Sequence, residues 1–168
     1  AASDVYKRQV QKSEHDGVHS FFVEKNARVR YVEKHYGEGD GNGKNVMNPT
    51  TVVSLAEGAY MEMETTQIKG VDSTVRKTTA KLAAGATLII KEKIMTHGSQ
   101  LAETDFTVDL DGDGSGANVI SRSVAKEHSR QVFRSNIRGN AKCSGHSECD
   151  AIIMDCLLYT SPSPRDST

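Results

Sequence analysis

The chain is poor in the residues that build broad aromatic cores and disulfide frameworks. Its 168 residues contain no Trp, four Phe and three Cys. Three cysteines make a poor disulfide framework and fit reduced thiols in a reducing compartment better, so we expect a cytoplasmic protein. So little aromatic content fits a fold with a narrow interior better than a sandwich with a broad aromatic core.

The chain also lacks an excess of either charge. It has 21 Lys and Arg against 22 Asp and Glu, a formal net charge of -1. This balance provides no basic field for nucleic acid and no polybasic patch for a membrane surface. No apolar stretch approaches the roughly 20 residues of a spanning helix, and the first residues lack the apolar middle of a secretory signal. We therefore expect one soluble domain that binds neither nucleic acid nor membrane.

The two ends differ in character from the rest of the chain. Residues 157–168 contain two prolines and three serines and show no alternation, which is typical of a disordered tail. Residues 156–168 resemble translated sequencing-adapter sequence, and residues 4–9 resemble its counterpart at the other end; a natural linker tail is the alternative for the last segment. We expect the domain to be a fragment formed by residues 10–155, with residues 1–9 and 156–168 outside it.

Between these ends, short alternating runs are separated by Gly, Asn and Asp. Their period-2 patterning and their content of Val, Ile and Thr predict strands rather than helices. The predicted strands are residues 21–31, 60–68, 74–82, 87–94, 104–110, 118–124 and 131–137. Residues 38–43 are rich in Gly and predict an excursion loop that interrupts the pattern once.

The pattern repeats at a nearly constant interval. Leu55, Leu82, Leu110 and Ile137 each precede a Gly-containing turn and are 27, 28 and 27 residues apart. A β-solenoid requires such a period with two strands per repeat, because each turn of the chain buries its inward face only by stacking on its neighbours. A β-sandwich also has evenly spaced strands. The interval favours an all-β solenoid with these four residues at equivalent positions in successive turns.

One acidic segment looks like a calcium loop. Asp109, Asp111 and Asp113 occupy alternate positions, but Gly112 comes too early for an EF-hand and Ile120 stands at the twelfth position, where a bidentate Glu is required. Repeated Asp-Gly pairs are also the usual chemistry of a tight turn between strands. We predict a turn here.

A second motif places Cys143, His146 and Cys149 within seven residues, beside Glu148. Such ligands suit zinc or iron, yet a closed zinc site needs a fourth, and the remaining cysteine lies in the adapter-like tail. On a regular strand Cys143 and Cys149 share a face while His146 points away, so joint ligation requires Gly145 to break the strand. The alternative for a single Cys is a small buried apolar side chain.

Motifs of known enzyme classes are missing. The sequence has no G-x-S-x-G and no P-loop, and the remaining histidines are scattered without a nucleophile at a recognisable spacing. A carbohydrate-active β-helix enzyme would need clustered carboxylates and aromatic platforms on one face, for which the sequence offers no support. We expect no enzymatic turnover by this chain.

Six segments together resemble the core of the SufB/SufD family. They occur in the family's order and span nearly all of residues 10–155: residues 27–31, 55–58, 121–126, 131–134, 139–143 and 148–155. The resemblance implies a right-handed parallel β-helix, in agreement with the repeat. It also implies a scaffold on which iron and sulfide are assembled into a transient iron–sulfur cluster, in complex with the SufC ATPase.

The resemblance also implies one site residue. Cys149 falls on the cysteine of the family's Q-C-D-S or E-C-D-S segment, which is implicated in cluster assembly in SufB, although Ala151 stands where Ser is common. A thiolate is the expected ligand for iron or for persulfide sulfur. Cys143, His146 and Glu148 are weaker candidates for the same metal site.

Three departures from the family pattern limit the expected activity. The upstream cysteine that receives sulfur in SufB would precede residue 10, the acidic and histidine ligands would follow residue 155, and the helical segment that binds SufC is missing. We expect that the fragment alone does not hold a cluster. Val52 stands where SufB has Lys, so SufB is not distinguished from SufD. The alternative function is a SufD-like β-helix subunit that pairs with a paralogue or a second copy without binding metal.

Overall fold

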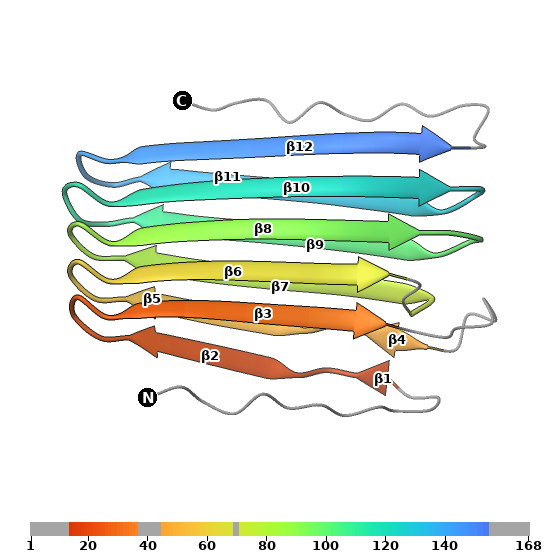
Figure 1. The fold of residues 1–168 in the computed structure, drawn as a ribbon, viewed down its shortest axis with the longest axis horizontal. Coiled ribbons are helices and arrows are strands. Elements are labelled where there is room, and N and C mark those ends of the chain that lie inside the picture. The colour runs from red at the N-terminus through yellow and green to blue at the C-terminus, as the bar shows by residue number, and fades with distance from the viewer. Residues whose placement is uncertain (1–13, 37–44, 69–70, 155–168) are drawn as a thin grey trace.

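The computed structural model describes residues 14–36, 45–68 and 71–154, which form strands and turns only. Figure 1 shows two sheets stacked face to face. One sheet contains five strands: β3 (Arg28–Tyr36), β6 (Tyr60–Ile68), β8 (Thr87–Thr96), β10 (Gly116–Lys126) and β12 (Ser144–Met154). The other contains seven: β1 (Glu14–His15), β2 (Val18–Val23), β4 (Val46–Met47), β5 (Thr50–Leu55), β7 (Ser73–Leu82), β9 (Leu101–Leu110) and β11 (Arg130–Gly139).

The two sheets are the two sides of one continuous coil. We call each successive pair, such as β7 and β8, a rung. Strands of successive rungs pair in parallel within each sheet, for example β8 with β10 and β7 with β9. In Figure 1 the front strands run to the right and the rear strands to the left while the chain climbs, which is a right-handed coil. The prediction of a right-handed parallel β-helix is confirmed.

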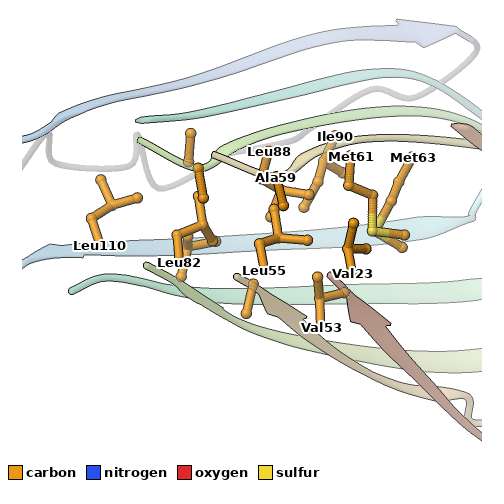
Figure 2. Close-up of a cluster of buried hydrophobic side chains, with 14 of the residues drawn as sticks. Val23, Val53, Leu55, Ala59, Met61, Met63, Leu82, Leu88, Ile90 and Leu110 are labelled. Atoms are coloured by element: carbon orange, nitrogen blue, oxygen red, sulfur yellow. The ribbon is translucent and has the colours of Figure 1, made fainter. Parts of the chain in front are cut away.

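Alternation of side chains fills the space between the sheets, which we call the lumen. Along β8 (TLIIKEKIMT) every second residue is buried, because successive side chains of a strand point to opposite faces. Leu55, Leu82 and Leu110 stack in register on β5, β7 and β9 and are at most 2% exposed. Across the lumen they face Met61 and Leu88 (Figure 2). Small and branched side chains suffice because the lumen is narrow.

The repeat prediction holds for three of its four residues. Ile137 pairs with Val108, and it is Gly139 that pairs with Leu110. The predicted equivalence of Ile137 is wrong because Leu110 and its in-register partner Gly139 are 29 residues apart, two more than the predicted interval of 27. Compared with the rung of β8, β10 and the turn before it are each one residue longer, and the turn after β10 is one residue shorter. The inward position of the leucine column therefore arrives two residues later.

Two other sequence predictions also change. The single strand predicted for residues 21–31 is divided by a turn between β2 and β3, where Asn26 adopts φ 60°. Strand β12 was not predicted as a strand, and neither was β5. The predicted excursion loop at residues 38–43 and the predicted end segments 1–9 and 156–168 lie outside the described residues.

The turns at one corner stack on one another as the strands do. Gly58, Gly85 and Gly114 all have φ near +70°, where a glycine avoids the steric cost that other residues meet. The Gly58 amide donates to the Ala84 carbonyl and the Gly85 amide to the Asp113 carbonyl, each at 2.9 Å. Backbone hydrogen bonds between rungs therefore continue through this corner.

The acidic segment is a turn, as predicted. β9 ends at Leu110 and β10 begins at Gly116. Asp111 accepts a hydrogen bond from Asn140 at 2.7 Å, and Asp113 accepts one from the Lys142 amide at 3.1 Å. These carboxylates bind the next rung.

No helix capable of crossing a membrane occurs among the residues that the structure describes.

Candidate functional site

The lumen has an apolar half and a polar half along the strand direction. Near the corner formed by the turns of Gly58, Gly85 and Gly114, the inward positions carry the stacked leucines, Leu55, Leu82 and Leu110, and their apolar neighbours. Farther along the same strands, in what we call the polar half, charged and hydroxyl side chains take several of the inward positions, among apolar ones. On β8, Glu92 stands between the inward Ile90 and Ile94, and on β7, Arg76 stands between Thr74 and Thr78. The alternation that buries Leu, Val and Ile thus also forces charged side chains inside.

Glu92 is enclosed in the polar half and is 3% exposed. The Thr104 hydroxyl, on the facing strand β9, donates to the Glu92 Oε1 at 2.8 Å. Arg76, 7% exposed, lines the same cavity of about 30 Å³. A cavity of this size has room for about one or two water molecules. Burial raises the pKa of Glu92, while the Arg76 charge and the hydrogen bond from Thr104 act in the opposite direction.

A second carboxylate lines this cavity from the strand β3. Glu33 accepts a close hydrogen bond from His35 Nε2. Burial acts to raise the pKa of Glu33, but the hydrogen bond and charge of His35, with Arg76 and His19, lower it below its ordinary value. Burial, with the charge of Glu33, raises the pKa of the adjacent Tyr31 to about 12. This part of the lumen therefore holds an ionised acid, a buried acid and a guanidinium close together.

Cys149 is in register with polar residues of the lumen on the two neighbouring strands of its sheet. In β12 it pairs in register with Ser121 of β10, and Ser121 pairs with Glu92 of β8. In-register neighbours in parallel strands point to the same side of a sheet, and Ser121 and Glu92 are both buried in the lumen. The thiol of Cys149 therefore faces the lumen. Cys149 is nevertheless exposed, because β12 pairs only with β10 among the described strands.

The surroundings of Cys149 favour the neutral thiol. Partial burial of the thiol by the neighbouring strands raises its pKa, and the negative charges of Glu92 and Asp150 raise it further. A thiolate here would need a nearby cation to offset those effects.

The other three candidates are not brought together with Cys149. Cys143 precedes β12 and packs against the hydrophobic core, about 20 Å of extended chain away from Cys149. His146 is on the outer face, with its Nε2 3.6 Å from a Glu148 oxygen. β12 runs unbroken through Gly145, so the strand break needed for joint ligation is absent. The described residues contain no group of three or more His, Cys, Asp or Glu arranged to hold a metal ion.

Sequence reasoning missed Glu33, Arg76 and Glu92. The alternation along the strands could have found Arg76 and Glu92, because each occupies an inward position in a strand whose other inward residues are apolar or Thr. A charge at such a position predicts an interior polar cluster once the strand is known to be buried on that face.

The amino-acid sequence of the chain matches a known protein family. The family model described as "SUF system FeS cluster assembly, SufBD core domain" matches residues 3–162. The chain belongs to the SufBD family.

Three relatives of this SufBD chain are similar to most of its length. An iron-sulfur cluster assembly SufBD family protein of Archaeoglobus fulgidus is 26% identical over 141 residues, which are 83% of this chain and 37% of the relative. One from Methanothermobacter thermautotrophicus is 25% identical over 165 residues, 94% of this chain and 38% of the relative. The ycf24 protein of Guillardia theta, of the same description, is 24% identical over 147 residues, 83% of this chain and 30% of the relative.

The chain thus spans well under half the length of these SufBD relatives. No solved structure gives a significant match to it.

Proposed function

We propose that this SufBD-family protein is a scaffold subunit of SUF iron–sulfur cluster assembly, in which Cys149 holds iron or persulfide sulfur while the cluster forms. The supporting observation is the position of Cys149. It is the one cysteine of the described chain that is both exposed and turned towards the polar lumen. The transient cluster is the product of the assembly.

The remaining ligands come from elsewhere in the assembled complex. A cluster normally takes four protein ligands, and the described residues place no further Cys or His beside Cys149. We infer that a paralogue or a second copy of the protein supplies them, and that a SufC-like ATPase provides the energy-consuming step. The chain itself then has no turnover, and it works in the reducing cytoplasm, where thiols stay reduced.

A SufD-like structural role is the second candidate, and the environment of Cys149 favours it. The raised pKa of Cys149 and the negative charge of Glu92 disfavour the thiolate that iron or persulfide binding requires. In this alternative the chain pairs with a cluster-binding paralogue and Cys149 is a structural thiol.

Anaerobic reconstitution distinguishes the two roles. The protein is mixed with a SufC-like ATPase, a SufB/SufD paralogue, ferrous iron and sulfide, and visible cluster absorbance is recorded. For a scaffold, Cys149→Ser abolishes the absorbance, while the matched variant Cys143→Ser retains it because Cys143 is packed in the core. Circular dichroism checks that both variants keep the β-helix. Full absorbance with Cys149→Ser would instead support the structural role.

A further inference from the structure

An apolar stripe crosses the outer face of the five-stranded sheet, on the opposite side of that sheet from the lumen. It consists of Ile68, Met95, Val124 and Ile152, which are in register on β6, β8, β10 and β12. Ile152 is 61% exposed, and the other three are half-buried. These four residues, with the side chains beside them, line a groove of about 350 Å³. An outward position of a solvent-facing sheet is ordinarily polar, so four apolar residues in line are unusual.

A cationic column runs beside the apolar stripe. The next in-register outward positions are Thr66, Lys93, Arg122 and Asp150. Lys93 is exposed and forms no ion pair within the described chain, and Arg122 approaches Asp150 only to 4.0 Å. All of these residues also line the groove.

Two cations elsewhere on this face have anionic partners on adjacent strands. Lys91 contacts Glu62 and Arg30 contacts Glu64, each at 3.3 Å. In the column beside the groove, the two cations Lys93 and Arg122 outnumber the single carboxylate of Asp150. An unpartnered cation next to an apolar groove fits a ligand that is both apolar and acidic.

The dimensions of the groove suit a helix. The stripe crosses the strands, so its side chains recur at the spacing between strands, about 4.8 Å. The turns of an α-helix recur every 5.4 Å, which is close enough for apolar residues one turn apart to meet successive rungs over a short contact. An added strand does not fit, because the backbone groups of β8 and β10 already pair with their neighbours on both sides. A lipid surface fits poorly because it requires apolar side chains that protrude.

We propose that this groove docks an acidic amphipathic helix of a partner polypeptide. Its apolar face lies along Ile68, Met95, Val124 and Ile152, and carboxylates on one flank meet Lys93 and Arg122. The surface is on the opposite side of the sheet from Cys149, so the proposal does not depend on cluster assembly.

A synthetic helix tests the proposal. The probe is a fluorescent peptide of about 18 residues, long enough to be helical in water, with Leu at i, i+4, i+7 and i+11 and Glu along one flank. Its binding to the whole chain is followed by fluorescence anisotropy. The double variant Lys93→Glu with Arg122→Glu should lower the affinity by about tenfold or more, which is about 1.4 kcal/mol. The control is Lys77→Glu with Lys81→Glu, two exposed cations on the other sheet, which should leave the affinity unchanged.

Charge exchange provides the decisive arm. A peptide with Lys in place of Glu should bind the unchanged protein weakly and bind the Lys93→Glu, Arg122→Glu variant more tightly. If the circular dichroism of that variant shows that its β-structure is lost, Met95→Gln is used in its place. This substitution should weaken the binding of the acidic peptide. Any of three outcomes would overturn the proposal. The protein could bind the acidic and the Lys-exchanged peptide with equal affinity, or the control variant could lose as much affinity as the Lys93→Glu, Arg122→Glu variant. The protein could also bind phosphatidylserine vesicles but not the peptide.

Discussion

Thr104 and Glu92 face each other across the polar half of the lumen, and the Thr104 hydroxyl donates to the Glu92 carboxylate at 2.8 Å. The carboxylate is otherwise enclosed, so ionising it costs free energy that this hydrogen bond and Arg76 only partly offset. The polar lumen is therefore a place where the fold tolerates a destabilising charge.

Replacing Glu92 with Gln should make the stability of the protein less sensitive to pH. A raised pKa in the folded state means that Glu92 favours folding below the ordinary value of 4.5 and that this contribution is lost as pH rises through the folded-state pKa. Glu92→Gln should match the unchanged protein at low pH and exceed it in unfolding free energy at alkaline pH. Urea denaturation across the pH range measures this difference. A less stable Gln variant at alkaline pH would show that the attraction of Arg76 outweighs the cost of burial.

Reactivity of the Cys149 thiol should respond to the same substitution. Besides burial, the charge of Glu92 raises the pKa of Cys149, so removing that charge should increase the thiolate fraction. In a Cys143→Ser background, Glu92→Gln should speed alkylation by iodoacetamide at alkaline pH, where Glu92 is ionised. Mass spectrometry of the Cys149 peptide follows the rate. An unchanged rate would mean that Glu92 does not act on the thiol through the lumen.

Truncating the leucine column should be costly. Leu82 is 1% exposed and stacks between Leu55 and Leu110, so Leu82→Ala leaves a cavity that the adjacent rungs close only partly. We expect a loss of about 2–5 kcal/mol in unfolding free energy. The neighbouring outward residue gives the control, since Lys81→Ala should change stability by less than about 0.5 kcal/mol. Comparable effects of the two variants in urea denaturation would argue against the assigned register.

Two glycines of one turn should differ in what they tolerate. A Cβ on Gly112 would lie 2.0 Å from the Ala84 nitrogen, in the backbone of the rung below. Gly114 has φ +74° but has room for a Cβ, which would lie 3.8 Å from Gly85. Gly114→Ala should therefore cost about 1–2 kcal/mol of conformational strain. Gly112→Ala should cost more, because the two turns must separate. Thermal unfolding of both variants ranks them, and the reverse order would contradict the close stacking of these turns.

The sequence predicts the type of fold well and the content of the lumen poorly. Period-2 patterning identifies a strand such as β6 within its true bounds, because the inward Met61 and Met63 alternate with the outward Tyr60, Glu62 and Glu64. It misses β12, whose residues are almost all exposed and so show no alternation of burial. The interval between leucines gives the coil but misplaces Ile137, since one rung is longer than the others.

Some residues of the candidate site can be predicted from the sequence and others cannot. Cys149 is predicted as a site residue through resemblance to the SufB/SufD family, and that role stays a prediction. Alternation along a regular strand predicts that Cys149 and His146 point to opposite faces, and the register of β12 places them so. Glu92 and Arg76 were missed because a charge in an alternating strand is ordinarily read as facing solvent. The structure shows that both lie inside, since their side chains are buried at inward positions of β7 and β8.

The stacking of rungs has a further consequence for how the molecule responds to damage. Each rung pairs only with the rungs directly above and below it, so no strand pairing in the described structure joins the first rung to the last. Such a molecule behaves as a linear array in which stability is passed between nearest neighbours. A lesion in β7 or β8 would interrupt this array in its middle, whereas a lesion in β12 would disturb the pairing with only one described neighbour, β10.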